Sequence, residues 1–202
     1  LFYAMQGIVS IFMPAIIGIV ADKFIPAQKV LSLCHGIAGL GMLAAGYYGM
    51  TAGAGAQFGT LFALYSVSVA FYMPTIALSN SVAYSGLEKY GLDPVKDFPP
   101  IRVFGTVGFI CSMLFVNFMK IDGVQFQMTY NQFLTSGVLG LALCLYALTL
   151  PACPVNKASG ETPSFVDIFG LRAFTLFRKK DMAIFFIFSM LLGISLQITN
   201  GY

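Results

Sequence analysis

The sequence predicts an all-α membrane protein, both from its composition and from the spacing of its apolar residues. Hydrophobic residues make up 58% of the chain and charged residues only 9%, whereas a soluble domain contains about 25% charged residues. Six apolar runs follow one another, each near the roughly 20 residues that a helix needs to cross a bilayer core. The alternation of polar and apolar residues that is typical of an outer-membrane barrel is missing. Because backbone groups in lipid must pair within their own segment, we expect each run to be a helix.

The basic residues between these runs predict how the helices cross the membrane. The expected helices are Leu1–Val20, Val30–Met50, Gln57–Tyr84, Ile101–Met119, Gln127–Leu150 and Met182–Tyr202. Nine basic residues lie after the first, third and fifth runs, namely Lys23, Lys29, Lys89, Lys96, Lys157, Arg172, Arg178, Lys179 and Lys180. The opposite loops contribute only Lys120. Since basic loops stay in the cytoplasm, the first helix enters from outside. The net charge of +3 does not indicate nucleic-acid binding, because these bases stand between apolar runs.

The chain divides by composition into three expected parts. It begins and ends inside apolar runs, so we expect a piece of a longer, transporter-sized protein. Residues 1–150 would form an N-terminal bundle of five membrane helices that lacks its first helix. Residues 151–181 start with the prolines and small polar residues of a linker and would be cytoplasmic. Residues 182–202 would be the first helix of a truncated C-terminal bundle.

The linker has one candidate element of its own. Ser164 and Asp167 have the spacing of a helix cap. A short interfacial helix after this cap would have an apolar side and a basic end. The residues concerned are Phe165, Ile168, Phe169 and Leu176 on the apolar side and Arg178, Lys179 and Lys180 at the end. The alternative is a loop that only tethers two helix bundles.

Arg102 is the most unusual residue of the predicted membrane helices. It stands at the head of Val103–Met119, which has no other charge, and an ionisable side chain inside a membrane costs roughly 2.5–3.5 kcal/mol on insertion scales. Arg102, Thr106 and Phe109 are spaced i, i+4 and i+7 and share one helix face. Together they offer directional donors, a hydroxyl and a stacking surface to a ligand with a planar ring. Alternatively, Arg102 snorkels to the cytoplasmic boundary, because Asp97 is only five residues away.

Small and amide side chains add two further expectations. Gly105, Gly108 and Ser112 fall on another face of the Arg102 helix, where they would let a neighbouring helix pack closely. In the last run, Gln197 and Asn200 are spaced i and i+3. An amide side chain both donates and accepts hydrogen bonds, so this pair could bind ribose hydroxyls or base edges in a cavity. The alternative is an interhelical hydrogen bond, worth about 1–2 kcal/mol at most.

The loop after the first run resembles a signature of the major facilitator superfamily. Residues 18–23 read Gly-Ile-Val-Ala-Asp-Lys, and the signature after the second helix of these transporters begins Gly-x-Leu-Ala-Asp-Arg. Gly18 would let helices approach, and Asp22 would pair with a base or a helix N-terminus of the opposing half, as a conformational gate. Residues 25–29 read Ile-Pro-Ala-Gln-Lys instead of the usual glycine and bases. Asp22 could therefore also be an ordinary interfacial acid.

Other segments resemble the nucleoside:proton symporter family of this superfamily, the bacterial nucleoside permeases. They are Phe12–Lys23, Tyr72–Thr75, Asp97–Phe109 and Met182–Asn200, in order over nearly the whole chain. The resemblance implies import of nucleosides across the bacterial inner membrane, driven by a proton gradient. It also implies the major facilitator superfamily fold, in part: six of an expected twelve helices, which form two bundles with the substrate between them.

The resemblance also implies which residues contact the substrate. Carried over by position, Arg102, Thr106 and Phe109 would contact it from the N-terminal bundle. Gln197 and Asn200 would contact it from the first helix of the C-terminal bundle.

The positions of the titratable residues predict where the proton-coupling site lies. No Asp or Glu lies deep in any of the six runs, although proton coupling usually needs a titratable group inside the membrane. We therefore expect the coupling carboxylate in the missing C-terminal half. For His35, the only histidine, we favour an interfacial or packing role over a proton relay. The expected partners are nucleosides, protons and the lipid bilayer, with no cofactor, metal, nucleic acid or obligatory protein partner.

Two alternative functions stay open on sequence grounds. A permease for sugars or other small polar solutes from the same superfamily would share the helix count, the loop charges and the Asp22 loop. A membrane-embedded enzyme is the alternative from another class. It is less favoured, because the sequence has no HExxH or GxSxG motif and no paired carboxylates within the membrane runs.

Overall fold

The computed structural model describes residues 1–154 and 171–201, with the side chains of 171–174 and 196–201 left outside the description. The chain separates into two compact units, Leu1–Lys157 and Ala158–Tyr202. Both units are α-helical, which confirms the predicted all-α class. The finer division of the chain at residues 150 and 181 stays a prediction.

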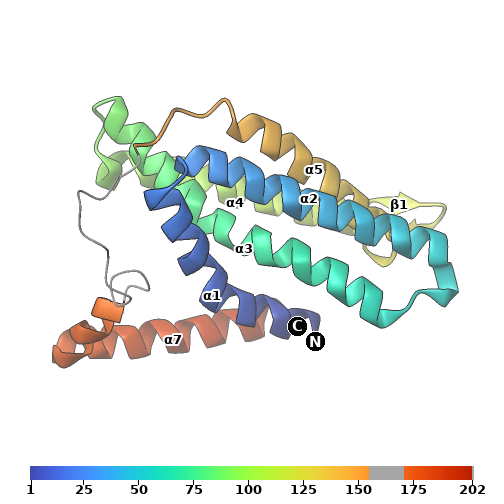
Figure 1. Ribbon diagram of the computed structural model, residues 1–202. Helices are drawn as coiled ribbons and strands as arrows, with labels where there is room; N and C mark the ends of the chain where they lie inside the picture. The colour runs from blue at the N-terminus through green and yellow to red at the C-terminus, as the bar shows by residue number, and fades with distance from the viewer. Residues whose placement is uncertain (155–170, 202) are drawn as a thin grey trace. The chain divides into compact units, whose positions relative to one another are not determined.

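The first unit contains five long helices (Figure 1). They are α1 (Phe2–Lys23), α2 (Ala27–Ala52), α3 (Phe58–Lys89), α4 (Pro94–Phe118) and α5 (Asn131–Ala147). Short 3-10 helices, η1 (Gly53–Gly55) and η2 (Phe126–Met128), lie before α3 and α5. A two-stranded antiparallel hairpin, β1 (Lys120–Ile121) and β2 (Val124–Gln125), follows α4. Among the described residues, α1, α2, α3 and α4 are long and apolar enough to cross a membrane, whereas α5 is shorter.

The second unit contains η3 (Leu171–Arg178) and α7 (Lys180–Gly201). The rings of Phe177 and Phe186 stack with centroids 4.6 Å apart, so η3 packs on the start of α7. Helix α7 covers the sixth predicted membrane run. The residues of the expected linker helix from Ser164 to Phe169 lie outside the described residues, and Leu176 belongs to η3.

Two helix boundaries differ from the predictions for identifiable physical reasons. Helix α4 begins at Pro94 rather than Ile101, because the Asp93 side chain caps it by accepting a hydrogen bond from the Val95 backbone N–H at 2.9 Å. Helix α5 begins at Asn131 rather than Gln127, because η2 and a turn occupy the start of the apolar run. Apolar composition marks what lipid can cover, whereas caps and turns decide where a helix begins.

Helices α2, α3 and α5 form the tightly packed part of the first unit. A Cβ added at Gly39 on α2 would lie 2.9 Å from the Gly137 carbonyl oxygen on α5, so the two backbones touch. Ser68 on α3 donates to the Ala38 carbonyl oxygen at 2.7 Å, which ties α3 to the other side of α2. Close backbone approach through small residues is how membrane helices gain packing energy in lipid. The core of the unit therefore runs along α2.

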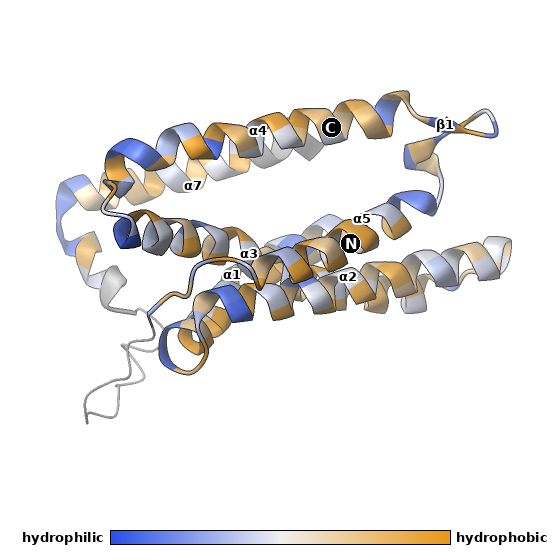
Figure 2. Cartoon of the chain, turned by 90° about the horizontal axis from the view of Figure 1, so that it is seen from above, coloured by the Kyte–Doolittle hydropathy of each residue, from blue (hydrophilic) through white to orange (hydrophobic). Residues whose placement is uncertain are grey.

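The outer surface of the helices is apolar. Figure 2 shows hydrophobic residues along the lengths of the helices and hydrophilic residues gathered mainly at helix ends and loops. Large apolar side chains such as Ile11, Leu40 and Leu145 are exposed. This distribution suits a chain whose surroundings are lipid acyl chains between two polar boundaries.

Candidate functional site

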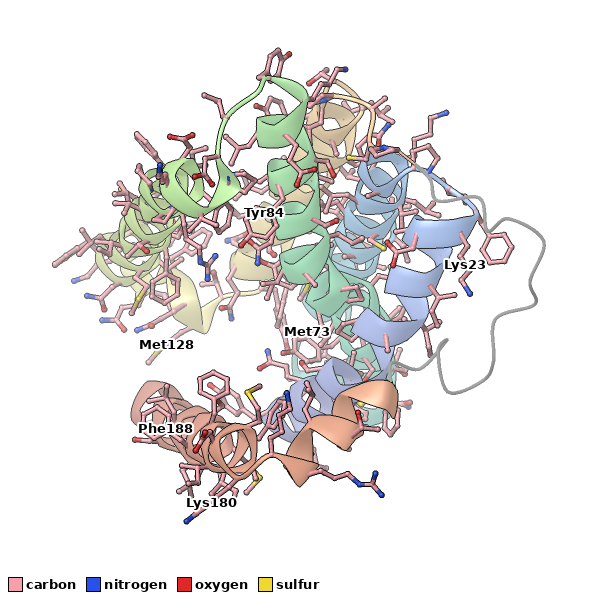
Figure 3. All side chains as sticks on the ribbon, turned by 90° about the vertical axis from the view of Figure 1, so that its left-hand side faces the viewer. Lys23, Met73, Tyr84, Met128, Lys180 and Phe188 are labelled. Atoms are coloured by element: carbon pink, nitrogen blue, oxygen red, sulfur yellow. The ribbon has the colours of Figure 1, made fainter. Side chains whose placement is uncertain are left out.

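The start of α4 holds Arg102 on a well-defined helix. Asp93 caps the helix, and the Asp97 carboxylate accepts a hydrogen bond from the Asp93 backbone N–H at 2.9 Å. The Phe98 ring meets the Tyr84 ring of α3 edge-on, with centroids 4.5 Å apart, and Tyr84 is labelled in Figure 3. Neither Asp93 nor Asp97 forms an ion pair with Arg102, two turns into the helix, in the described part of the chain.

The three residues predicted as substrate contacts lie on an open face of α4. Arg102, Thr106 and Phe109 are all exposed, and the Phe109 side chain is 63% exposed. Within the described part of the chain, Arg102 makes no ion pair and no hydrogen bond. It lies eight residues into α4, about 12 Å along the helix axis. This face presents a free guanidinium, a hydroxyl and an aromatic ring side by side.

The prediction that Gly105 and Gly108 pack against a neighbouring helix is not met within the described residues. A Cβ at either position would have no heavy atom within 4 Å, and Ser112 Oγ donates to the carbonyl oxygen of Gly108 on its own helix. Helix α4 touches α3 mainly near its start, and none of its residues is buried. The close glycine contacts of the unit are instead those between α2 and α5.

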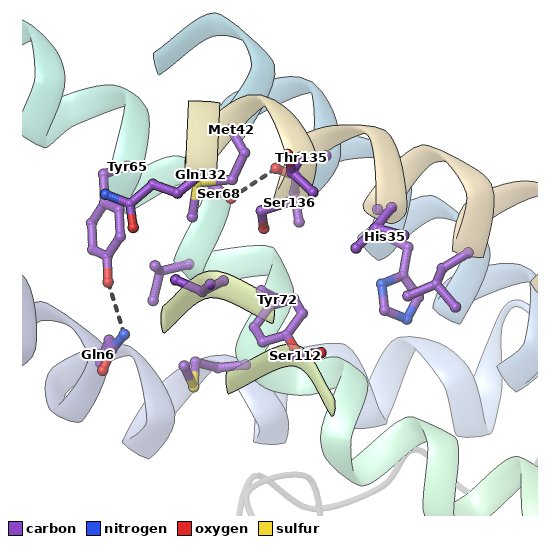
Figure 4. A pocket seen from close by; sticks show the side chains of 18 of the residues that line it. Gln6, His35, Met42, Tyr65, Ser68, Tyr72, Ser112, Gln132, Thr135 and Ser136 are labelled. Carbon is purple, nitrogen blue, oxygen red and sulfur yellow. Dashed lines mark hydrogen bonds between the residues drawn. The ribbon is translucent and has the colours of Figure 1, made fainter. Parts of the chain in front are cut away.

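A cavity of about 830 Å³ lies between α4 and the other helices of the first unit (Figure 4). We call it the inter-helix cavity. Its polar lining comes from all five helices and is made of Gln6, His35, Tyr65, Ser68, Tyr72, Ser112, Gln132, Thr135 and Ser136. Arg102, Thr106 and Phe109 are not among the residues that line it. The predicted ligand face and the cavity are therefore two different surfaces of α4.

Five of the nine polar residues that line the cavity have side-chain hydrogen bonds within the unit: Gln6, Tyr65, Ser68, Ser112 and Gln132. Gln6 Nε2 donates to Tyr65 Oη at 2.8 Å, and Ser68 donates to the Ala38 carbonyl oxygen. Gln132 donates to the carbonyl oxygen of Gln127 just before α5. The His35 Nδ1 atom is buried and has no hydrogen-bond partner among the described residues.

Sequence reasoning did not find this cavity. Its polar residues are spread over five helices without a shared motif, so no spacing along the chain connects them. His35 was expected to pack or to lie at the interface, and its ring does lie 6.3 Å from that of Tyr72, edge-on. The unpaired Nδ1 atom was not foreseen, because it depends on what neighbouring helices offer.

The other predicted site residues are placed as follows. Gly18 and Asp22 lie in the second half of α1, where a Cβ at Gly18 would meet nothing within 4 Å and Asp22 is exposed. Asp22 has no ion pair in the described part of the chain. Gln197 and Asn200 belong to α7, and their side chains lie outside the described residues. The gate and the amide contacts stay predictions.

The described residues contain no group of His, Cys, Asp and Glu side chains that could hold a metal ion. The four cysteines are free thiols, with Cys34 and Cys153 buried.

Comparison with protein families gives a match over the full chain. Residues 1–202 match the family described as nucleoside H+ symporter. Nucleoside permease NupG of Escherichia coli is 42% identical over 203 residues, and the xanthosine permease of the same bacterium is 44% identical over 200 residues. Each match covers 99% of this chain and 45% of the relative. The chain thus spans about half the length of the curated relatives it matches.

Comparison with solved structures supports the same relationship. Two crystal structures of the nucleoside transporter NupG match with TM-scores of 0.79 and 0.73, each at 41% sequence identity. Each covers 98% of this chain and 46% of the solved chain.

Proposed function

Because the chain belongs to the nucleoside H+ symporter family, we propose that the protein it is part of imports nucleosides across the bacterial inner membrane together with protons. The observation that carries this proposal is the family match over residues 1–202. It is supported by the Arg102 guanidinium on a membrane-length helix, which makes no ion pair with the described residues. The protein then acts as a permease by alternating access and not as an enzyme. Nucleosides, protons and the bilayer are its partners.

The substrate site proposed for this chain is centred on the open face of α4. Arg102 donates hydrogen bonds to sugar hydroxyls or base carbonyls, and Thr106 adds a hydroxyl one turn further along. Phe109 stacks on the base, and base–aromatic stacking contributes about 1–3 kcal/mol where it has been measured in nucleic-acid complexes. Gln197 and Asn200 of α7 complete the site with amides. The exposure of the α4 residues and the engagement of Asp97 elsewhere support this assignment.

The proposed proton site lies outside residues 1–202. The acidic side chains of the described residues stand at helix ends or in loops: Asp22, Glu88, Asp93, Asp97, Asp122 and Asp181. A coupling group must lose and gain its proton inside the membrane pathway. The gate proposed at the cytoplasmic side is Asp22, with Gly18 four residues before it, at the end of α1.

Uptake measurements with the full-length protein test this function. Bacteria without nucleoside uptake of their own are given the protein and radiolabelled uridine, and accumulation is measured with and without a protonophore. We expect accumulation that the protonophore abolishes and that excess unlabelled nucleoside, but not excess sugar, competes away. Competition by sugars alone would support the sugar permease alternative. Uptake that the protonophore does not affect would indicate facilitated diffusion instead of proton symport.

A further inference from the structure

The residues that follow α5 are held against the start of α2 by a buried hydrogen bond. Gln28 is the second residue of α2, and its side-chain Oε1 accepts a hydrogen bond from the Cys153 backbone N–H at 3.0 Å. The two residues are 125 positions apart in the sequence. Gln28 is 5% exposed and Cys153 is 7% exposed. Water therefore has little access to compete for this bond.

The segment that makes this bond has few other ways to pair its backbone. We call residues 151–154 the linker start. Pro151 and Pro154 have no N–H group, so only Ala152 and Cys153 can donate from this segment. Pro151 also packs on the end of α3, because a Cβ built at Gly86 would lie 3.6 Å from the Pro151 Cγ atom. The linker start thus bridges the beginning of α2 and the end of α3.

The linker start also belongs to the apolar cluster that closes the corner between α1 and α2. Cys153 packs in this buried cluster together with Ala21 near the end of α1 and Ala27 at the start of α2. Residues 24–26 are the whole connection between the two helices. Asp22, the proposed gate residue, directly follows Ala21 in the chain. A displacement of the linker start would therefore uncover the corner that carries the gate.

The polar contact of this corner with the linker start is a neutral one. The charged side chains of the corner are those of Asp22, Lys23 and Lys29, and none of them forms an ion pair in the described part of the chain. Breaking the Gln28–Cys153 bond would leave a buried amide oxygen and a buried N–H group unsatisfied, which is costlier than losing an exposed bond. The amide of Gln28 therefore resists separation of the linker start from the corner.

We propose that Gln28 is a positioning residue that anchors the linker start to the corner between α1 and α2, so that the linker start and the gate move as one body. The inference rests on the proposed function, because alternating access moves one helix bundle against the other. Gln28 lies neither on the Arg102 face of α4 nor in the lining of the inter-helix cavity. Its loss should therefore slow the conformational change and leave substrate affinity nearly unchanged.

Uptake kinetics of the full-length protein test the anchor. Gln28→Leu removes the hydrogen-bond acceptor and keeps a side chain in the buried space, whereas Gln28→Glu keeps acceptor oxygens in the first turn of a helix, where an acid is favourable. We expect the maximal uptake rate per folded molecule to fall about three- to tenfold in Gln28→Leu, with the KM for uridine changed less than about twofold. Gln28→Glu should restore most of the rate. Lys29→Gln, at the exposed neighbouring position, is the matched control and should transport normally.

A bond that only stabilises the fold would lower the amount of folded Gln28→Leu protein but not the rate per molecule. That result would overturn the proposal, as would an equal loss of rate in Gln28→Glu. If Gln28→Leu does not fold, Cys153→Pro removes the same bond from the donor side, because proline has no N–H. Cys153→Ala keeps the N–H and is its control. Equal rates in these two variants would likewise refute the anchor.

Alkylation of the Cys153 thiol tests the anchor without any transport. N-ethylmaleimide is added to membranes that contain the full-length protein, and mass spectrometry of the digest measures modification at Cys153. We expect Cys153 to react much more slowly in the native protein than in denaturant, and Gln28→Leu but not Lys29→Gln to speed the reaction. A native Cys153 that reacts as fast as the denatured one would show that the linker start is not anchored. A wild-type protein without nucleoside uptake would refute the proposed function, and this measurement would still decide on the anchor.

Discussion

The α2–α5 contact and the exposed side of α4 are two membrane-helix surfaces of opposite character. Between α2 and α5, glycines bring the backbones together, with a Cβ at Gly137 only 2.8 Å from the Gly39 carbonyl oxygen. On α4, a Cβ at Gly105 or Gly108 would have no described heavy atom within 4 Å, and no residue of the helix is buried. Both surfaces contain small residues, yet only the α2–α5 surface has a packing partner within the described residues.

This difference distinguishes a surface that stabilises the fold from a surface that is available for substrate binding. The α2–α5 contact is complete within the unit, so substitutions there should act on folding. On helix α4, Arg102 makes no ion pair with any described residue and lies on one face, and the cavity wall lies on another. Substitutions on the exposed side of α4 should therefore act first on transport. The predictions below test this separation in order of expected effect.

The largest effect is expected at the closed contact. A leucine at Gly39 would force its side chain into the α5 backbone, which lies 2.9–3.2 Å from the added Cβ. Overpacking costs about 1–3 kcal/mol even where neighbours can move, and backbone cannot move away as a side chain can. We expect Gly39→Leu to reduce the folded, monodisperse full-length protein at least tenfold, measured by fluorescence-detected size-exclusion chromatography.

The matched control is Gly59→Leu in the first turn of α3, where a Cβ meets nothing within 4 Å. We expect it to give nearly normal amounts. Equal recovery of both variants would show that the α2–α5 contact is looser than the structure describes.

Sequence alone predicted the helices well, because membrane-length apolar runs have few structural solutions. The run Leu1–Val20 became α1 (Phe2–Lys23) almost residue for residue. Their mutual packing was harder to predict, because helices surrounded by lipid are apolar on all sides and show little periodicity. Gly39 and Gly137 therefore gave no signal as contact partners, whereas the glycines of α4 did and have no partner in the described residues.

For the candidate site, the sequence predicts only how residues are spaced along one helix. The spacing of Arg102, Thr106 and Phe109 on one helix needs only helical geometry, and α4 supplies it. The inter-helix cavity brings together residues as distant as Gln6 and Leu143. Such a juxtaposition follows from tertiary packing, which a single sequence does not encode in any local spacing.

The next largest effect is expected for transport at Arg102. Hydrogen bonds to charged groups contribute about 1.5–3 kcal/mol, and each 1.4 kcal/mol changes affinity tenfold. We expect Arg102→Ala to reduce uridine uptake at least tenfold at unchanged membrane levels. Lys96→Ala is the control on the same helix, because the Lys96–Asp93 pair is solvent-exposed and worth little. Normal uptake by Arg102→Ala would remove Arg102 from the site and favour the snorkelling interpretation.

A smaller effect is expected at Phe109, where Leu preserves apolar contact but loses the stacking plane. We expect Phe109→Leu to raise the Kd about three- to tenfold, and by a similar factor for purine and pyrimidine nucleosides, because stacking is base-tolerant. Calorimetry with the purified full-length protein measures this. Phe118→Leu at the end of α4, also exposed, is the control and should bind normally. A loss confined to one base would contradict the stacking role.

The smallest effect is expected at the α2–α5 contact, for the contribution of one hydrogen bond to the stability of the folded protein. Ser32 on α2 is buried and donates to the Cys144 carbonyl oxygen on α5 at 2.7 Å. Interhelical hydrogen bonds in membranes average about 0.6 kcal/mol, so Ser32→Ala should lower the unfolding midpoint by about 1–2 °C. Ser10→Ala is the control, because Ser10 bonds only within α1 and is exposed. If Ser32→Ala unfolds the protein as Gly39→Leu does, the α2–α5 contact depends on this polar bond and not on backbone packing between glycines.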